Sequence, residues 1–231
     1  MIKKLCKTYD FLLDRIISVF FVIIMLLGIY FIYDSAYVFY NSSAAKVHGY
    51  IENPDDVTEI KKLSEDFVAW LIIDDSGIDY PVVQGSNNAE YLNKNAYGEY
   101  SLSGAIFLDS RNNSHFEDDY SVVYGHHMEN NFMFGALDSF KNKSFFDSHR
   151  KGTLKIGEEN SFNVKEIETF AFLVVDASEE TIFDPTINNN VINYARKNAS
   201  IFYEPSGEHI VALTTCKSPE STLRTIVLVS F

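Results

Sequence analysis

The sequence predicts a mostly β protein: an antiparallel β-barrel with helical insertions, preceded by one transmembrane helix. Short runs rich in β-branched and aromatic residues recur along the chain between turn residues, a pattern typical of barrels. Near the N-terminus, the 18 residues from Ile16 to Tyr33 carry no charge. As a helix this stretch would span about 27 Å of hydrocarbon, enough to cross a membrane.

The charges that flank this stretch predict its orientation. The basic residues that precede it are Lys3, Lys4, Lys7 and Arg15. Beyond it come Asp34 and then no basic residue until Lys46. The positive-inside rule therefore predicts a cytoplasmic N-terminus over residues 1–15, an anchor in the cell membrane over 16–33 and an extracellular remainder.

A cleavable signal peptide is the alternative interpretation, with Ser43, Ala44 and Ala45 as small residues for cleavage. The apolar core of a signal peptide is normally about 7 to 15 residues and cleavage follows it closely, so we favour an uncleaved anchor. The only two cysteines, Cys6 and Cys216, then lie on opposite sides of the membrane and cannot pair. An unpaired exported thiol is a candidate for chemistry or for intermolecular pairing. The alternative is a buried, inert cysteine.

The exported part is strongly acidic. The formal net charge is −13, of which residues 1–33 contribute +2, so residues 34–231 carry −15. Such a surface repels phosphate backbones, and no basic stripe with interleaved aromatic residues is present, which argues against nucleic-acid binding. The length left after the anchor suits one domain with a substantial core.

The elements follow in chain order. Residues 34–56 are interpreted as a juxtamembrane linker, with a short helix from Asn53 to about Leu63, and residues 57–231 as the folded domain. Strands are predicted at 67–73, 78–83, 105–108, 121–124, 153–156, 161–175, 209–216 and 223–229, and short helices at 88–92, 133–140 and 189–197. Residues 74–77, Asp-Asp-Ser-Gly, mark a hairpin turn between the first two strands.

Two strands carry the residues that indicate chemistry. One ends in Cys216 and the next opens with Arg224 after a short loop, which would place a thiol beside a guanidinium. When a thiolate attacks an amide carbonyl, the oxygen becomes negative, and a fixed guanidinium can stabilise it. The alternative for Arg224 is an ordinary salt bridge at a strand edge.

A thiol nucleophile needs an acid/base partner, usually histidine. Of six histidines, His126 is the candidate, because it follows a predicted strand and Gly125, which allows close backbone approach. In extended backbone His127 would point to the opposite side. Adjacent histidines without further ligands at ligand spacing are weak evidence for a metal, so we expect neither a metal nor a cofactor.

Three motifs together resemble those of the sortases. Leu213-Thr214-Thr215-Cys216 is similar to the Leu-x-Thr-Cys signature of that family, Tyr124-Gly125-His126 to its Gly-His element, and Arg224 to its essential arginine. Class B is indicated by the Tyr-Gly-His-His-Met sequence that starts at Tyr124 and by the helical insertion before the cysteine strand. The resemblance covers roughly residues 57–231.

Sortases are membrane-anchored cysteine transpeptidases of Gram-positive bacteria that fold as an antiparallel β-barrel. The resemblance implies that Cys216 attacks the carbonyl of a threonine in a C-terminal sorting motif of a surface protein and forms a thioacyl-enzyme. His126 protonates the leaving amine. An amine of the peptidoglycan cross-bridge or of its lipid-linked precursor then takes the acyl group. The resemblance implies no calcium site, and no clustered carboxylate loop suggests one.

The resemblance also implies residues that line the motif groove: Asn88, Leu92, Thr214, Thr181 and Ile182. The alternatives are a helix cap for Asn88 and a core position for Leu92. Class B suggests an Asn-Pro-x-Thr-type motif. Because Lys217 and Ser218 replace acidic residues that some members carry after the cysteine, Ser-Pro-x-Thr-Gly and Leu-Pro-x-Thr-Gly stay open.

Two other functions are compatible with these residues. One is a cysteine endopeptidase, in which water takes the acyl group in place of an amine. The other is a membrane-tethered binding protein on a catalytically silent barrel, against which the presence of Cys216, His126 and Arg224 together argues.

Overall fold

The computed structural model describes residues 2–42, 63–128, 131–157, 161–186, 190–216 and 222–231. The chain divides into two compact units, Met1–Asn41 and Ser42–Phe231. The linker helix predicted from Asn53 to Leu63 and the residues Lys217 and Ser218 fall outside the described residues, apart from Leu63 itself.

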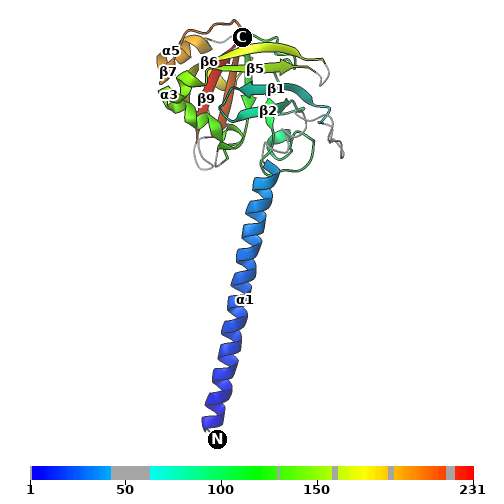
Figure 1. The fold of residues 1–231 in the computed structure, drawn as a ribbon, viewed down its shortest axis with the longest axis vertical. Coiled ribbons are helices and arrows are strands. Elements are labelled where there is room, and N and C mark those ends of the chain that lie inside the picture. The colour runs from blue at the N-terminus through cyan, green and yellow to red at the C-terminus, as the bar shows by residue number, and fades with distance from the viewer. Residues whose placement is uncertain (1, 43–62, 129–130, 158–160, 187–189, 217–221) are drawn as a thin grey trace. The chain divides into compact units, whose positions relative to one another are not determined.

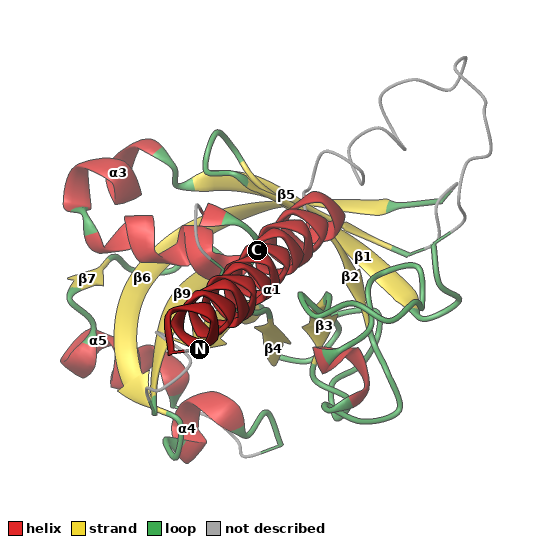
Figure 2. Ribbon diagram, turned by 90° about the horizontal axis from the view of Figure 1, so that it is seen from below, coloured by secondary structure: helices red, strands yellow, loops and turns green. Residues whose placement is uncertain are grey.

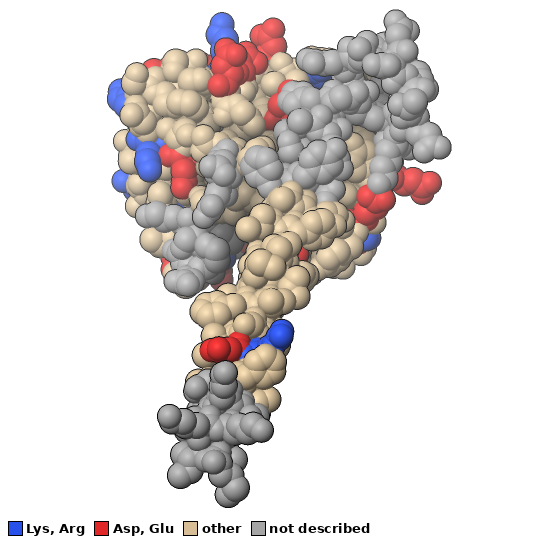
Figure 3. Space-filling view, turned by 60° about the horizontal axis from the view of Figure 1, so that its bottom comes forward, with Lys and Arg blue, Asp and Glu red and all other residues tan. Residues whose placement is uncertain are grey.

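The N-terminal unit is a single helix, α1 (Ile2–Ser42), which extends beyond the predicted 16–33 at both ends. Its segment Phe11–Tyr37 has a mean hydropathy of 2.8, and none of its most apolar window is buried within the protein. On the face of this helix that Figure 3 shows, the charged side chains form one group near one end, and Asp34 is a further charged residue near the other end of the segment. A helix that is apolar on all sides needs an apolar environment around it. The unit is therefore compatible with a single-pass membrane anchor.

The second unit is a closed barrel of eight strands (Figure 1). The ring runs β5-β1-β2-β3-β4-β8-β9-β6, and pairing of β5 with β6 closes it. The strands of the ring are β1 (Phe67–Ile73), β2 (Ile78–Val83), β3 (Ile106–Leu108), β4 (Tyr120–Tyr124), β5 (Lys151–Ile156), β6 (Asn163–Asp176), β8 (Ile210–Cys216) and β9 (Leu223–Ser230). A ninth strand, β7 (Ile201–Phe202), adds to the free edge of β6.

The predicted mostly β barrel is confirmed, with one refinement. Six of the pairs in the ring are antiparallel, but β2 pairs with β3 and β4 pairs with β8 in parallel. Parallel neighbours need a long crossover connection, and residues 84–105 and 125–209 supply it. Both crossovers carry helices and residues of the functional site. The predicted turn at 74–77 joins β1 to β2, with Asp75 and Gly77 at positive φ.

Both faces of the sheet are buried, and this explains the long apolar runs in its strands. Along β8, Val211 and Leu213 belong to the cluster inside the barrel, whereas Ile210 and Ala212 belong to a second cluster outside it. Successive side chains of a strand point to opposite faces, so one strand serves both clusters.

Helical segments cover the two clusters. The inner cluster is completed by the 3-10 helix η3 (Phe134–Lys141) and by α3 (Lys143–Ser148), and the outer cluster by α4 (Glu180–Phe183) and α5 (Val191–Asn198). A further 3-10 helix, η1 (Glu90–Leu92), lies in the first crossover. Figure 2 shows β6 as a long curved strand with β7 and α5 at its outer side. The helices predicted at 88–92, 133–140 and 189–197 correspond to η1, η3 and α5, and α3, α4 and β7 were not predicted.

Candidate active site

A pocket of about 350 Å³ opens where the C-terminal ends of β4 and β8 meet the start of β9. The strand register brings these segments together. Tyr124 is the Cα partner of Thr214 across the parallel pair, and Cys216 is the Cα partner of Arg224 across the antiparallel pair. The residues that line the pocket are Asn88, Leu92, Phe107, Tyr124, Gly125, His126, Ala177, Phe183, Thr214, Thr215 and Arg224. Five of the predicted site residues therefore line the same pocket: Asn88, Leu92, His126, Thr214 and Arg224.

The imidazole of His126 is held by the backbone of η1. Its Nε2 lies 2.8 Å from the carbonyl oxygen of Leu92. A carbonyl oxygen only accepts, so Nε2 donates in this contact and Nδ1 is the basic nitrogen of the neutral ring. Gly104, at φ +59°, allows the approach: a Cβ there would lie 2.7 Å from the Leu92 oxygen and 2.9 Å from His126 Cδ2. The sequence did not single out Gly104.

The neighbouring His127 faces away from the pocket. Its Nε2 lies 3.1 Å from Oδ2 of Asp138 on η3, and the other oxygen of Asp138 accepts a hydrogen bond of 2.9 Å from Thr225 Oγ1. His127 is thus tied to η3 and β9, and it does not line the pocket. This arrangement agrees with the expectation that the side chains of His126 and His127 point in opposite directions.

Arg224 is the second residue of β9, is half-buried and lines the pocket. Its Nη1 donates to the carbonyl oxygen of Leu223 at 3.3 Å. Asp176 lies close enough for the Arg224 charge to act on it. Hydrogen bonds from Ser178 lower the pKa of Asp176, and those from Thr222 and the charge of Arg224 add to this. Arg224 therefore lies at the end of the β8–β9 strand pair where Cys216 also lies.

The two groove residues in the first crossover line the pocket in different ways. Asn88 is half-buried, with Nδ2 donating to Asp109 Oδ2 and Oδ1 accepting from the Ser110 N–H, both at 2.8 Å. The N-cap position of η1 is Ala89, so Asn88 does not cap that helix. Leu92 is 39% exposed and is not a core residue.

The structure does not bring Thr181 and Ile182 into the pocket. Ile182 is fully buried in the outer cluster, and its carbonyl oxygen accepts a hydrogen bond of 2.7 Å from Tyr120. The next residue, Phe183, lines the pocket instead. The helical turn of α4 decides which side chain faces the pocket, and the sequence gives no periodicity over so short an element.

A buried carboxylate beside the pocket was also missed by the sequence analysis. Asp109 directly follows β3, has a fully buried side chain and pairs with Arg111 at 2.7 Å. Burial raises the pKa of Asp109, but hydrogen bonds from Arg111 and Asn88 outweigh this, so its pKa lies below the usual value. Burial and the Asp109 charge raise the pKa of Tyr124. The sequence did contain a signal for this carboxylate, because the charged residues Asp109 and Arg111 come directly after a strand that reaches the pocket.

Comparison with known proteins identifies the family. The sequence model of the sortase domain matches residues 71–230. The chain belongs to the sortase family. It is 32% identical to sortase B of Listeria monocytogenes over 194 residues, 80% of this chain and 76% of that protein. It is 27% identical to sortase B of Staphylococcus aureus over 184 residues, 73% of this chain and 71% of that protein.

Solved structures agree with this assignment. A class B sortase of Streptococcus pyogenes, described as involved in pilus biogenesis, superposes with a TM-score of 0.64 at 38% identity, covering 72% of this chain and 92% of that one. The C232S mutant of Clostridium perfringens sortase B gives a TM-score of 0.62 at 29% identity, covering 71% and 80%. The prediction of a class B sortase is confirmed, and the sortase described here is a cysteine transpeptidase.

Proposed function

We propose that this sortase cleaves a C-terminal sorting motif after threonine and joins the protein to a peptidoglycan amine, with Cys216 as nucleophile. The observation that supports this most directly is the pairing of Cys216 with Arg224 at a pocket that His126 also lines. In this proposal α1 is a single-pass anchor with a cytoplasmic N-terminus, and the catalytic domain is extracellular.

The proposed reaction has two acyl transfers. The thiolate of Cys216 attacks the threonine carbonyl, and Arg224 stabilises the oxyanion. The C–N bond breaks, and protonated His126 gives its proton to the leaving amine, which leaves a thioester. An amine of the cross-bridge or its lipid-linked precursor then attacks the thioester, and His126 takes its proton. A new amide forms, and the thiolate is released.

Intact-mass spectrometry of the full chain in detergent micelles tests this proposal. The protein is incubated with Asn-Pro-x-Thr, Ser-Pro-x-Thr-Gly and Leu-Pro-x-Thr-Gly peptides, with and without a peptidoglycan-type amine. We expect a thioacyl adduct that the amine converts to a ligated peptide. An adduct that resolves only to hydrolysed peptide would favour an endopeptidase, and no adduct with any motif would favour a binding protein.

Replacement of each histidine in turn tests the assignment of the acid and base. His126→Ala should lower kcat/KM for peptide ligation by about 100- to 10,000-fold, because general acid–base catalysis contributes about this factor. His127→Ala is the matched control and should stay within about tenfold of wild type, since the His127 ring contacts Asp138 and lies outside the pocket. A larger loss in His127→Ala than in His126→Ala would reverse the assignment.

Arg224→Lys tests the oxyanion role. Lysine keeps the charge but lacks the planar fork of donors, so we expect kcat to fall about 100-fold, the usual effect of losing one oxyanion donor. The control is Arg196→Lys, which makes the same change at an exposed ion pair with Glu204. Steady-state ligation assays compare the two. Wild-type kcat in Arg224→Lys would remove this arginine from the oxyanion role.

A further inference from the structure

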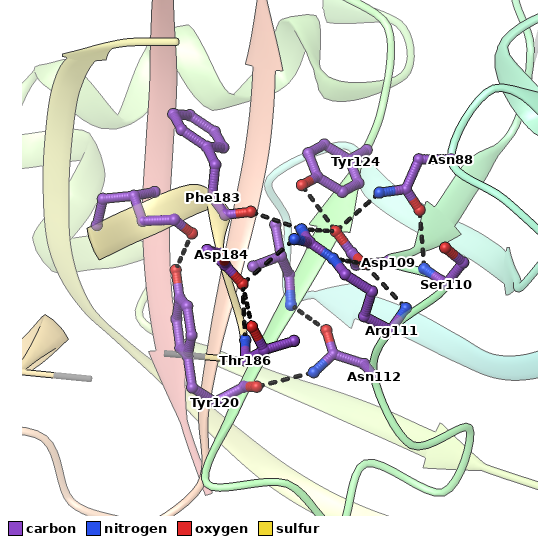
Figure 4. A network of polar contacts seen from close by, with 12 residues as sticks. Asn88, Asp109, Ser110, Arg111, Asn112, Tyr120, Tyr124, Phe183, Asp184 and Thr186 are labelled. Atoms are coloured by element: carbon purple, nitrogen blue, oxygen red, sulfur yellow. Dashed lines mark hydrogen bonds and ion pairs between the residues drawn. The ribbon is translucent and has the colours of Figure 1, made fainter. Parts of the chain in front are cut away.

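Asp109 is the centre of a hydrogen-bond network behind the pocket (Figure 4). Its buried carboxylate accepts five hydrogen bonds. Three come from Arg111, through its backbone N–H, Nε and Nη2, at 2.7 to 3.0 Å. The others come from Asn88 Nδ2 at 2.8 Å and from the Tyr124 hydroxyl at 3.0 Å. One carboxylate thus holds two residues that line the pocket.

Arg111 extends the network to the opposite wall. Its Nη2 donates to the carbonyl oxygen of Phe183 at 2.7 Å, and its Nη1 lies 3.2 Å from Asp184 Oδ1. Figure 4 shows the guanidinium between Asp109 on one side and Phe183 and Asp184 on the other. The arginine therefore joins the barrel to the end of α4, which lies in the insertion between β6 and β8.

Three residues of the pocket wall depend on this pair: Asn88, Tyr124 and Phe183. They lie on segments that are far apart in the sequence. The amide of Asn88 is also fixed in orientation, because Nδ2 must donate to the carboxylate and Oδ1 must accept from the Ser110 N–H. Asp109 and Arg111 themselves do not line the pocket.

We propose that Asp109 and Arg111 are positioning residues that set the width of the sorting-peptide groove. They hold the wall formed by Asn88 and Tyr124 at a fixed separation from the wall that Phe183 forms at the end of α4, here called the α4 wall. This inference rests on the proposed function, because it takes the pocket to be the groove for a sorting peptide. The pair acts on peptide binding and leaves the chemical step unchanged, since its described hydrogen bonds go to Asn88, Tyr124 and Phe183 and not to His126, whose ring contacts the Leu92 carbonyl.

Arg111→Lys is the decisive variant. Lysine keeps a positive charge opposite the buried Asp109 carboxylate, but an ammonium cannot donate in the fixed fork that reaches Asp109 and the Phe183 carbonyl together. The α4 wall is then released while the charge balance of the interior is kept. Asp184→Asn is a milder second variant, because it leaves the Asp109–Arg111 contacts intact and removes only the charge that faces Arg111.

The chain offers a matched control in Arg150→Lys. Like Arg111, Arg150 binds a carboxylate, Glu168 at 2.8 Å, and a backbone carbonyl, that of Thr169 at 3.1 Å. It does not line the pocket. The same chemical change is therefore made at the same kind of contact, away from the groove.

Two measurements on the full chain in detergent micelles test the proposal. Steady-state ligation kinetics with the sorting peptide that acylates wild type should show KM raised about tenfold in Arg111→Lys, with kcat within about twofold, as expected for loss of a charged hydrogen bond that acts on binding. Asp184→Asn should raise KM in the same direction by less. Arg150→Lys should change neither constant more than about twofold.

Hydrogen exchange measured by mass spectrometry gives a readout that does not depend on activity. The amides of Ile182, Phe183 and Asp184 donate to carbonyls of Glu179 and Glu180. Their exchange should accelerate in Arg111→Lys and stay at the wild-type rate in Arg150→Lys.

The outcomes separate this inference from the proposed function. If KM in Arg111→Lys equals that of wild type, the positioning role is overturned, whether or not exchange at α4 is faster. A fall in kcat at constant KM overturns it as well. Absence of an acyl adduct in wild type overturns the proposed function, and the groove assignment with it. Unchanged exchange at α4 overturns the link between Arg111 and that wall even when the adduct forms.

Discussion

Cys216→Ala is expected to abolish the thioacyl adduct. Loss of the sulfur removes the only atom that can form a thioester at the end of β8, so the peptide-dependent mass increase should fall below detection with every sorting motif. The side-chain change is small, and the melting temperature should stay within a few degrees of wild type. Intact-mass spectrometry and thermal denaturation of the same samples provide both readouts.

Cys6→Ala is the matched control for this experiment, because Cys6 is the other cysteine of the chain. It should form the adduct as wild type does. Peptide mapping of the wild-type adduct should place the acyl group on the fragment that contains Cys216. An adduct that persists in Cys216→Ala and disappears in Cys6→Ala would exclude the proposed nucleophile.

Asp109→Asn is expected to have the largest effect on stability. An amide nitrogen cannot accept, so the substitution leaves a donor of Arg111, Asn88 or Tyr124 without its acceptor, and Arg111 keeps only its charge pair with Asp184. The Asp109 side chain is fully buried but that of Arg111 is 40% exposed, so the cost lies below that of a fully buried ion pair, at about 1 to 3 kcal/mol, as for a buried polar group that loses its partner. For a domain of this size the melting temperature should fall by roughly 2 to 12 °C.

The control for this prediction is Asp147→Asn. Asp147 pairs with Lys143 at 2.8 Å, but both side chains are largely exposed. An exposed pair contributes about 0 to 1 kcal/mol, so the melting temperature should change by no more than a few degrees. Equal shifts in the two variants would show that the Asp109 network does not stabilise the fold more than a surface pair.

The stabilisation by Asp109 should also depend on pH. The folded state lowers the pKa of this carboxyl below its ordinary value of 3.8. A group with a lowered folded pKa stabilises the fold fully above its unfolded pKa and loses this contribution as pH falls through the folded value. The difference in unfolding free energy between wild type and Asp109→Asn should therefore be constant from pH 7 to about 5 and shrink below about pH 4. Denaturant titrations at several pH values would measure it, and a difference that shrinks already between pH 7 and 5 would contradict the assignment.

Much of the barrel was predictable from local pattern. The strands β1 and β2 were predicted at their observed bounds, because alternating and β-branched runs between turn residues are a local signal. Short elements without such a signal were missed: α3, α4 and β7. The two parallel pairs were missed as well, since parallel pairing depends on where long crossovers bring distant segments.

The residues of the candidate site also fall into two groups, those that local motifs predicted and those that depend on packing. His126, Thr214 and Arg224 were predicted from motifs within a few residues of a strand end, and the register of β4, β8 and β9 brings their segments to one pocket. Thr181 and Ile182 were placed on the correct insertion, but the turn of α4 presents Phe183 instead. Which side chain of a one-turn helix faces a pocket depends on how that helix packs.

The strand pattern, the apolar N-terminal helix and the order of histidine, cysteine and arginine could all be predicted from the amino-acid sequence, because each is a local or linear property of the chain. The contacts that hold the walls of the pocket could be recognised only in the folded structure. Asn88, Asp109, Arg111, Tyr124 and Phe183 come together through the two crossovers, and a buried carboxylate can be recognised only once the residues that donate to it are known. Hydrogen-bond partners so distant in the chain leave no periodic signal in it.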